Sequence, residues 1–285
     1  MKWILPLFLI SLSAQAQELK VLTWNTFLIP PPYNFTKQAQ RTLEMKALLP
    51  TLDHDLMFFQ ETFFDKKRNT LIRALKDSHP FIALPKKGRK LKQIQDSGLF
   101  IASRYPLKVL DQVIFSRCAK EDCFSSKSAI LVEVTLPNDQ KIQMINTHLQ
   151  AWNEPKTIEV RRTQFLQIKE MLSRHEVPGV PQVLVGDLNV DARVGPEYES
   201  SLSLLGMVSG PLTGDLVATN GFSTAGCFKN PGDGVAQEWI DHMWLKSNGA
   251  PTVIVAKKVL PLMGLINYTE CPLSDHYALE AKIKL

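Results

Sequence analysis

The chain has 285 residues, of which 45% are hydrophobic, and its 33 basic and 28 acidic side chains give a net charge of +5. The hydrophobic content is enough for a substantial core, and the mild charge excludes the strong basicity typical of polyanion-binding proteins. No Gly/Ser/Pro-rich linker, internal repeat or low-complexity tract divides the sequence, so we expect a single domain.

The first residues have the pattern of a secretory signal peptide. Lys2 precedes an apolar run over residues 3–12, and Ala14-Gln15-Ala16 places small residues at the cleavage positions. The run is too short to span a membrane, and a buried first strand is the alternative. We therefore expect a signal peptide over residues 1–16, a mature domain over 17–285 with a net charge of +4, and a secreted protein, extracellular or periplasmic.

Hydrophobic periodicity predicts an α+β fold in which strands dominate. In chain order, the pattern predicts a strand at 19–24, a helix at 36–49, a strand at 56–59, a helix at 65–76, strands at 98–103, 109–115, 128–136 and 141–147, a helix at 157–174, a strand at 183–186, a short helix at 197–205, and strands at 239–245, 252–259 and 277–284. This order favours two sheets packed face to face with helices outside.

Polar side chains follow the apolar strands at six places. They are Asn25, Glu61, Asn146 with His148, Asp187 with Asn189, Asp241, and Asp275 with His276. One such ending is ordinary, because Asp and Asn are common in turns. Six endings built only from Asn, Asp, Glu and His are typical of a metal-assisted phosphoryl-transfer site at one rim of the sheets.

The order of these motifs resembles the endonuclease/exonuclease/phosphatase superfamily, which contains pancreatic DNase. The matching pieces are Thr23-Trp24-Asn25, Gln60-Glu61, Asn146-Thr147-His148-Leu149, Gly186-Asp187-Leu188-Asn189, Ile240-Asp241 and Ser274-Asp275-His276. They extend over residues 22–279. The resemblance implies a four-layer α/β/β/α sandwich of two packed mixed β-sheets, with the site at one end of the sheets.

Within that superfamily, the chain is most similar to the secreted bacterial neutral sphingomyelinases. Gln60-Glu61-Thr62-Phe63 resembles their Gln-Glu-x-Phe, and Asp122-Cys123-Phe124-Ser125-Ser126-Lys127 resembles their Asp-Cys-x-x-x-Lys. The chain departs from the family at Ser128, where Gly is usual, and at His242, where Tyr is usual. The resemblance implies hydrolysis of sphingomyelin to ceramide and phosphocholine. A secreted nuclease and a catalytically inactive lipid-binding module are the alternatives.

The chemistry of a phosphodiester suggests which residues bind metal and which act as base. The anionic substrate needs a divalent cation, and Mg²⁺ prefers few carboxylates together with water. Glu61 with Asn25 is the expected ligand pair, Asp275 and His276 complete the candidate set, and Mn²⁺ or Co²⁺ are alternative ions. His276 is also the expected general base, because imidazole titrates near neutral pH, and Asp241 would orient it.

The remaining candidates would handle the phosphate and the leaving group. His148 would protonate or stabilise the leaving oxygen, and Asp187 and Asn189 would bind the phosphate oxygens and the leaving side. Lys127 would offset charge in the transition state. Asn146 and Asp122 complete the predicted substrate-binding set.

The cysteines and the remaining histidines are expected to have no catalytic role. Export permits disulfides, and sequence proximity favours pairing Cys118 with Cys123, which leaves Cys227 for Cys271. Free buried cysteines are the alternative. His242 points away from the predicted site and is expected to be structural, whereas three histidines beside turn or charged residues are expected to be solvated: His54, His79 and His175.

An apolar run over residues 259–268 lies shortly before the Asp275-His276 motif. Pro261 and Gly264 make it a poor helix or strand, so we expect an exposed loop that enters the headgroup region of a membrane, with Lys257-Lys258 on anionic lipid. Core packing is the alternative. The only basic cluster lies over residues 86–92, so a nucleic acid is not an expected partner, and we expect a monomer.

Overall fold

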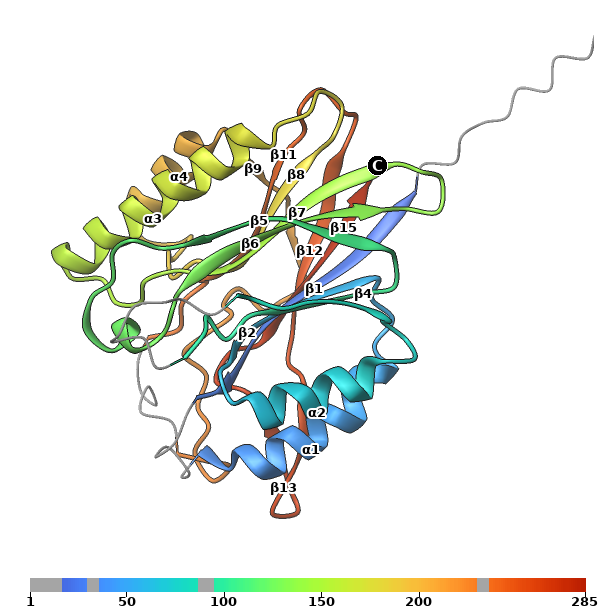
Figure 1. Ribbon diagram of the computed structural model, residues 1–285. Coiled ribbons are helices and arrows are strands. Elements are labelled where there is room, and N and C mark those ends of the chain that lie inside the picture. The colour runs from blue at the N-terminus through green and yellow to red at the C-terminus, as the bar shows by residue number, and fades with distance from the viewer. Residues whose placement is uncertain (1–16, 30–35, 87–94, 230–235) are drawn as a thin grey trace, which may run out of the picture.

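In the computed structural model, two β-sheets pack face to face and helices cover their outer faces (Figure 1). The structure describes residues 17–29, 36–86, 95–229 and 236–285. The predicted signal peptide lies outside these residues, as does all but Lys86 of the basic cluster at 86–92. No helix in the described ranges is long and apolar enough to cross a membrane.

The first sheet has seven strands and mixed directions. Its strand order is β10 (Leu212–Thr213), β12 (Val253–Leu260), β15 (Ala278–Lys284), β1 (Glu18–Leu28), β2 (Leu56–Thr62), β4 (Phe100–Ser103) and β3 (Phe81–Ala83). At its centre, β1 pairs in parallel with β2 and antiparallel with β15. The chain therefore brings its first and last strands together.

The second sheet has six strands and is also mixed. Its order is β5 (Leu107–Ile114), β6 (Ser128–Thr135), β7 (Lys141–His148), β8 (Gln182–Asp187), β11 (Asp241–Lys246) and β9 (Val208–Ser209). Only β7 and β8 pair in parallel, and the helix between them supplies the crossover that a parallel pair requires.

Two helices cover each outer face. α1 (Gln38–Leu48) and α2 (Asp65–Leu75) pack on the seven-stranded sheet, and α3 (Pro155–Arg174) and α4 (Glu197–Leu205) pack on the six-stranded sheet (Figure 1). Two short 3₁₀ segments, η2 (Leu49–Thr51) and η3 (Lys120–Phe124), complete the helical elements of the described residues. These layers confirm the predicted α/β/β/α sandwich.

Strand alternation explains why the apolar runs are continuous. Val21 and Phe58 face the core between the sheets, whereas Leu22, Trp24 and Phe59 face α1 and α2. Successive side chains of a strand point to opposite faces of the sheet. A strand that is covered on both faces therefore has apolar residues on each face.

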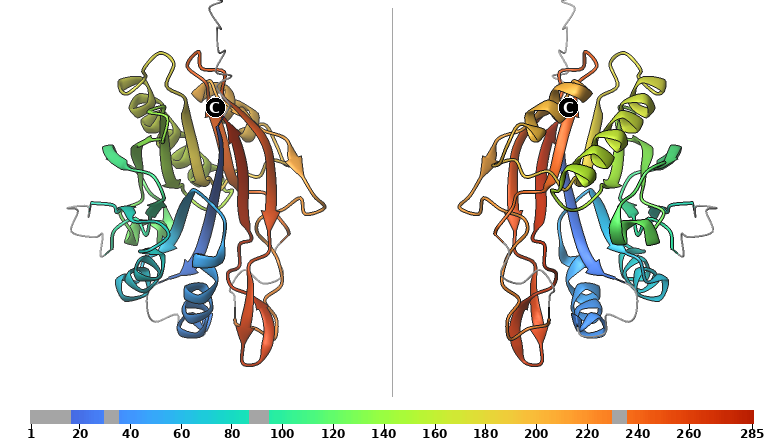
Figure 2. Two further views of the ribbon diagram at one scale, coloured as in Figure 1. Left: turned by 90° about the vertical axis from the view of Figure 1, so that its right-hand side faces the viewer. Right: turned by 90° about the vertical axis from the view of Figure 1, so that its left-hand side faces the viewer.

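The apolar run at 259–268 is a β-hairpin and not the predicted irregular loop. β13 (Met263–Ile266) pairs antiparallel with β14 (Thr269–Pro272), and the hairpin projects beyond α1 and α2 (Figure 2). Leu262 and Ile266 are 8% and 0% exposed in the core beneath α1, whereas Leu265 is 58% exposed and Tyr268 fully exposed. Part of the run therefore packs in the core, and part of it lies on the surface.

Both predicted disulfides are present, but two predictions of exposure are wrong. The bonds join Cys118 to Cys123 and Cys227 to Cys271. His54 and His79 are buried, because Nε2 of His79 bonds to the His54 carbonyl oxygen at 2.9 Å and Nε2 of His54 pairs with a carboxylate at 2.8 Å. These long-range partners leave no local signal in the sequence.

Lys257 is also buried, so it cannot lie on anionic lipid as predicted. Its ammonium donates to the hydroxyl of Ser209 and lies 4.6 Å from the centre of the Trp239 ring. Burial lowers the pKa of Lys257 to about 8. Its neighbour Lys258 is exposed, in keeping with alternation along β12.

Candidate active site

The predicted polar residues meet at one rim of the two sheets. β1, β2, β7 and β8 end at this rim, and β11 and β15 begin there because they run antiparallel to their neighbours. In the six-stranded sheet, Asp187 lies opposite both His148 and Asp241. In the seven-stranded sheet, Asn25 lies opposite the residue that precedes Glu61. Strand register therefore assembles the site.

His276 is held by a short hydrogen bond to a buried carboxylate. Nδ1 of the ring lies 2.8 Å from Oδ2 of Asp241, and Nε2 lies 3.8 Å from Oδ2 of Asp187. The Trp24 indole fixes the backbone here, since its Nε1 donates to the His276 carbonyl at 3.0 Å. Burial lowers the pKa of the ring, but the carboxylates of Asp241, Asp187 and Asp275 outweigh it and raise that pKa well above the ordinary value.

Asp187 is the carboxylate toward which other site residues converge. Its Oδ2 accepts a hydrogen bond from Nδ2 of Asn25 at 2.9 Å and lies 3.5 Å from Nε2 of His148. Burial, followed by the charge of Asp241, raises the pKa of Asp187 to about 7. A carboxylate so deprived of water is stabilised by any added donor or cation.

Glu61 contributes a carboxylate oxygen with nothing bound to it. The residue has a left-handed backbone with φ of 54°, which is uncommon outside glycine and turns its side chain at the end of β2. Oε1 lies 3.9 Å from Nε2 of His148, whereas Oε2 is buried and finds no hydrogen-bond partner among the described residues. Burial, and then the charge of Asp275, raises the pKa of Glu61 to about 7.

These features fit a divalent cation between Glu61 and Asp275. The unpaired, buried Oε2 of Glu61 lies near the partly buried carboxylate of Asp275, and a cation would remove the repulsion between the two acids. Asn25 lies alongside, and although its Oδ1 accepts the backbone N–H of Phe27 at 3.1 Å, an amide oxygen keeps a second lone pair. Carboxylate and amide oxygens are the hard ligands that Mg²⁺ prefers.

A second group of residues could also hold a metal ion. Ligand atoms of Asp187, Asp241 and His276 lie within 4.8 Å of one another. However, the bond to Asp241 occupies Nδ1 of His276, so the ring has one nitrogen left. His276 was predicted both as general base and as metal ligand, and its one remaining nitrogen can serve only one of these roles at a time. The hydrogen bond to Asp241 is typical of a general base that is oriented by a carboxylate.

His148 is buried and neutral at physiological pH. Burial, followed by the charges of Lys127 and His276, lowers the pKa of His148 well below the ordinary value. A neutral imidazole can donate a hydrogen bond but carries no charge. Of the two roles predicted for His148, stabilising the leaving oxygen therefore fits better than protonating it as a free imidazolium.

Lys127 and Asp122 form a buried ion pair that braces the site. The Lys127 ammonium lies 3.0 Å from Oδ2 of Asp122 and donates to the Leu149 carbonyl at 2.5 Å. The same Oδ2 accepts the backbone N–H of Ala151 at 2.8 Å. Asp122 thus makes structural contacts in this structure, and its predicted contact with substrate stays a prediction, whereas the charge of Lys127 acts on the site through space.

The amide of Asn146, predicted to bind substrate, makes three hydrogen bonds to the two sheets in this structure. Nδ2 donates to the carbonyls of Phe59 and Phe100 at 3.1 Å each, and Oδ1 accepts from Nε2 of Gln60 at 2.8 Å. This buried amide ties β7 to β2 and β4 across the sandwich. A motif residue can thus serve the scaffold of a site.

Asn189 lies at the rim where the motif placed it. Its backbone N–H donates to Oδ1 of Asp187 at 3.0 Å, and its φ of 53° is left-handed. Its Nδ2 donates to the Leu149 carbonyl at 3.1 Å. This bond uses one of the two N–H donors of the amide, so the other can still donate to a phosphate oxygen as predicted.

Arg41 is a site-supporting residue that the sequence did not indicate. It is fully buried, and its guanidinium donates to the carbonyls of Thr26 and Leu273 at 2.9 Å and of Phe27 at 2.6 Å. These carbonyls belong to the segments that carry Asn25 and the Asp275-His276 motif. Burial lowers the pKa of Arg41 to about 10, against the opposing charges of Asp275 and Glu61.

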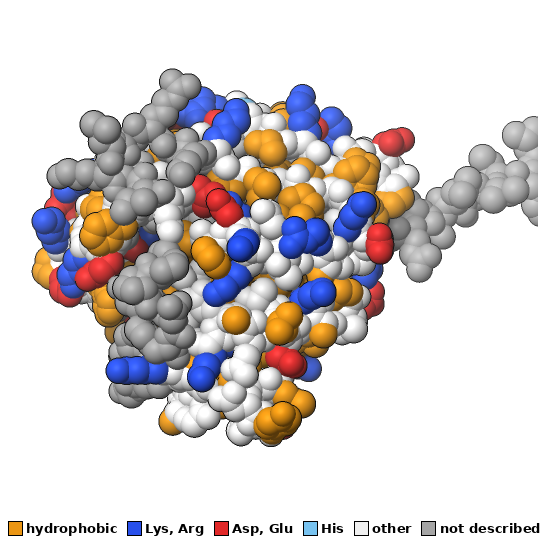
Figure 3. All heavy atoms as spheres, turned by 60° about the horizontal axis from the view of Figure 1, so that its bottom comes forward, with side chains coloured by type: hydrophobic (Ala, Val, Ile, Leu, Met, Phe, Trp, Pro, Cys, Tyr) orange, Lys and Arg blue, Asp and Glu red, His pale blue; other side chains and the backbone are white. Residues whose placement is uncertain are grey.

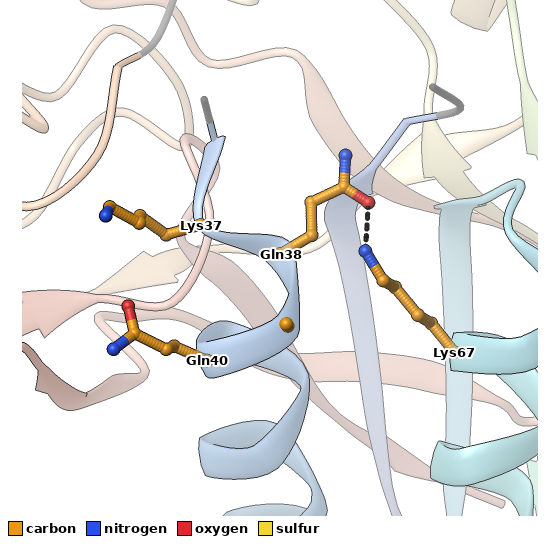
Figure 4. A pocket seen from close by; sticks show the side chains of 5 residues that line it. Lys37, Gln38, Gln40 and Lys67 are labelled. Atoms are coloured by element: carbon orange, nitrogen blue, oxygen red, sulfur yellow. Dashed lines mark hydrogen bonds between the residues drawn. The ribbon is translucent and has the colours of Figure 1, made fainter. Parts of the chain in front are cut away.

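A separate surface pocket of about 360 Å³ lies at the start of α1 (Figure 4). Its labelled side chains are those of Lys37, Gln38, Gln40 and Lys67. Gln38 and Lys67 point toward each other and form a 2.7 Å hydrogen bond. Gln40 donates to Asn267 at the tip of the β13–β14 hairpin. The pocket contains none of the predicted catalytic residues, and Gln40 links it to the hairpin.

Comparison with curated proteins places the chain near bacterial sphingomyelinases, although no family model matches it. It is 26% identical to sphingomyelinase C of Leptospira interrogans over 288 residues, which cover 91% of this chain and 50% of that protein. It is 24% identical to sphingomyelinase C of Bacillus cereus over 302 residues, which cover 95% of this chain and 90% of that protein. The chain thus spans half the length of the Leptospira interrogans protein.

Solved structures share the fold. A double mutant of beta toxin from Staphylococcus aureus with bound magnesium ions superposes with a TM-score of 0.75 at 19% identity, over 93% of this chain and 99% of that one. An endonuclease/exonuclease/phosphatase family protein from Bacteroides thetaiotaomicron gives a TM-score of 0.68 at 14% identity, over 95% and 99%. The DNase-like fold is thereby confirmed, and the chain is similar to sphingomyelinase C within the endonuclease/exonuclease/phosphatase superfamily, as its motifs predict.

Proposed function

We propose that this chain is a secreted, Mg²⁺-dependent sphingomyelin phosphodiesterase of the phospholipase C type, which releases ceramide and phosphocholine. The observation that carries the proposal is the His276–Asp241 hydrogen bond at the same rim as three other acids, the buried Asp187 and the partly buried Glu61 and Asp275. An oriented base beside a cluster of cation-seeking carboxylates suits hydrolysis of an anionic diester. The similarity to proteins named sphingomyelinase C supports the choice of lipid.

In this proposal, His276 and Asp241 act on the attacking water, and His148 acts on the leaving group. Nε2 of His276 takes a proton from water, whose oxygen attacks phosphorus while the bond from phosphorus to the ceramide oxygen breaks. Asp241 keeps the ring oriented and stabilises the imidazolium that forms. The neutral His148 donates a hydrogen bond toward the departing oxygen, which takes up a proton from solvent to give ceramide, while the proton on His276 is released to solvent and the base is restored.

The acids Glu61 and Asp275, with Asn25, would hold the metal. When bound, Mg²⁺ supplies neutralisation of phosphate charge and Lewis-acid polarisation. Asn25 would link the two halves of the site, because its Nδ2 also fixes Asp187.

The test is phosphocholine release from sphingomyelin vesicles and from phosphatidylcholine vesicles, each with and without EDTA. The proposal expects release from sphingomyelin that EDTA abolishes and His276→Ala reduces. Cleavage of supercoiled plasmid without phosphocholine release would instead identify a nuclease. Vesicle binding without turnover at saturating Mg²⁺ would identify an inactive lipid-binding module.

Access to the lipid would use the β13–β14 hairpin. The face that carries α1, α2 and the hairpin has hydrophobic and basic side chains interspersed (Figure 3). Leu265 and Tyr268 are the exposed apolar and aromatic residues of the hairpin. Such a surface suits the interface between water and the lipid headgroups.

A further inference from the structure

Two exposed aromatic residues, Phe124 and Trp152, lie on segments beside the candidate site and outside the hairpin. Phe124 is 62% exposed at the end of η3, and Trp152 is 54% exposed on the loop that follows His148. Hydrogen bonds join the two segments, since Asp122 accepts the Ala151 backbone N–H. A single exposed aromatic residue needs no explanation, but two on segments that hydrogen bonds join point to an interaction surface.

The backbone of Trp152 is held in a strained conformation that the fold stabilises from beneath. Its φ is 74°, a left-handed value that costs a bulky residue about 1–3 kcal/mol. Its carbonyl accepts hydrogen bonds from Nη1 of Arg161 at 2.8 Å and from the hydroxyl of Thr157 at 2.9 Å. Arg161 is fully buried and also pairs with Glu197 at 2.7 Å. A buried network thus fixes the backbone from which the exposed ring projects.

This aromatic surface is tied to the catalytic rim. The loop that carries Trp152 begins at Leu149, whose carbonyl accepts from both Lys127 and Asn189. The segment that carries Phe124 is closed by the Cys118–Cys123 disulfide. Neither ring can move far without moving residues beside the site.

We propose that Phe124 and Trp152 form a second membrane contact, which docks the rim of the site onto a zwitterionic phospholipid surface. This inference rests on the proposed function only for the identity of the membrane lipid. Phenyl and indole rings favour the interface between headgroups and acyl chains.

The local charge favours a zwitterionic surface over an anionic one. The segments 118–127 and 149–154 together carry Lys120, Lys127, Glu121, Asp122 and Glu154. Both lysines are already paired, Lys120 with Glu154 and Lys127 with Asp122. The Lys120 ammonium also lies 5.2 Å from the centre of the Trp152 ring, which leaves that ring face unavailable to a second cation such as choline.

Trp152→Gly tests the inference without loss of the fold. Glycine adopts φ of 74° without strain, so the variant should unfold at the same temperature as the wild type or higher. Binding to phosphatidylcholine vesicles in EDTA, measured by co-sedimentation, should fall about tenfold, the effect of losing one buried aromatic side chain. Phe124→Ser should have a similar effect, and Trp152→Phe should restore most of the binding.

The matched control is Val208→Ser. Val208 is 64% exposed on β9, which pairs with the part of β11 that runs away from Asp241. Its loss should leave vesicle binding unchanged. Wild-type binding by a folded Trp152→Gly protein would overturn the inference, even if the protein hydrolyses sphingomyelin. Conversely, loss of vesicle binding on this substitution would support it even if the proposed hydrolysis is absent.

Discussion

The imidazole of His276 donates from Nδ1 to a carboxylate of Asp241 that is wholly buried, over 2.8 Å. This hydrogen bond keeps one ring proton on Nδ1, so in the neutral ring Nε2 carries no proton and can accept one, as a general base must. His276→Ala should therefore reduce turnover by about 10²–10⁴ while the protein stays folded. Turnover of sphingomyelin vesicles by the folded variant is the measurement.

Asp241→Asn should cause a loss of the same order, for a different reason. An asparagine amide can donate to Nδ1, which would place the ring proton on Nε2 and remove the base. His175→Ala is the control, since that partly exposed histidine pairs with Asp111 at the end of α3 and should not affect the rate. Near-wild-type turnover by either site variant would remove this pair from the mechanism.

Glu61→Gln should weaken metal binding while leaving the metal-free protein at least as stable as the wild type. Glu61 lies beside Asp275, and burial and this charge raise the pKa of Glu61 to about 7, so removing its charge relieves repulsion. The rise in melting temperature that Mg²⁺ causes in the wild type should be lost. An unchanged Mg²⁺ titration of melting temperature would exclude Glu61 as a ligand.

His242 should make the protein less stable as the pH falls from 6.5 to 4. Burial is the main cause that lowers the pKa of His242 from 6.5 to about 4, so in this range the unfolded chain binds a proton that the folded protein does not. The free energy of unfolding should fall by about 3 kcal/mol over the range, and then no further from this residue.

Urea unfolding at pH 7.5 and 4.5 measures this effect. His242→Gln should show a smaller difference between the two pH values than the wild type. Other buried histidines such as His79, whose pKa is also lowered by burial, affect both proteins equally. Equal pH dependence in the two proteins would contradict the prediction.

Arg41→Lys should weaken metal binding through the backbone. Lysine keeps the charge but loses the fork that holds the carbonyls of Phe27 and Leu273, so the segments bearing Asn25 and Asp275 should loosen. Loss of a supporting partner of this kind costs about 10–100-fold in metal affinity. Isothermal titration with Mg²⁺ should detect this loss, and Arg161→Lys, at a buried arginine paired with Glu197, should not show it.

Sequence patterns predicted the layers for two reasons. Each buried strand is an apolar run, and the order of the motifs is specific to the endonuclease/exonuclease/phosphatase superfamily. Sequence patterns could not predict β3, β9 and β10, since two or three residues are too short to show periodicity. The hairpin was missed because Pro261 and Gly264 argue against a strand. Pro261 lies between β12 and β13, and Gly264 fits closely against Leu273 and Glu44, which leave no room for a side chain.

The sequence indicated which residues form the candidate site, but not the hydrogen-bond partners of those residues. Strand ends identified Asp187 and His276, since the alternation of a strand fixes which side chains reach the rim. The roles of Asn146 and Asp122 depend on contacts between segments distant in sequence, which no local pattern encodes. Arg41 lies in an ordinary helical sequence, and only the packing of α1 shows that it supports the segments that carry the candidate metal ligands.

The hairpin tip makes the final prediction, because stability and membrane binding should change in opposite directions there. Asn267 and Tyr268 both have positive φ, 50° and 65°, and link Ile266 to its partner Thr269. Two such residues are typical of a type I′ turn, for which Asn-Gly is preferred.

Tyr268→Gly should therefore preserve or raise the melting temperature while it reduces binding to sphingomyelin vesicles in EDTA. Hydrolysis of a soluble phosphodiester should be unaffected, since the ring is fully exposed and distant from the core. Ile266→Ser, at a position with no exposure, should instead cost about 2–5 kcal/mol of stability. Unchanged vesicle binding by Tyr268→Gly would show that the hairpin tip does not touch the membrane, and a marked fall in its melting temperature would show that the Tyr268 ring stabilises the fold.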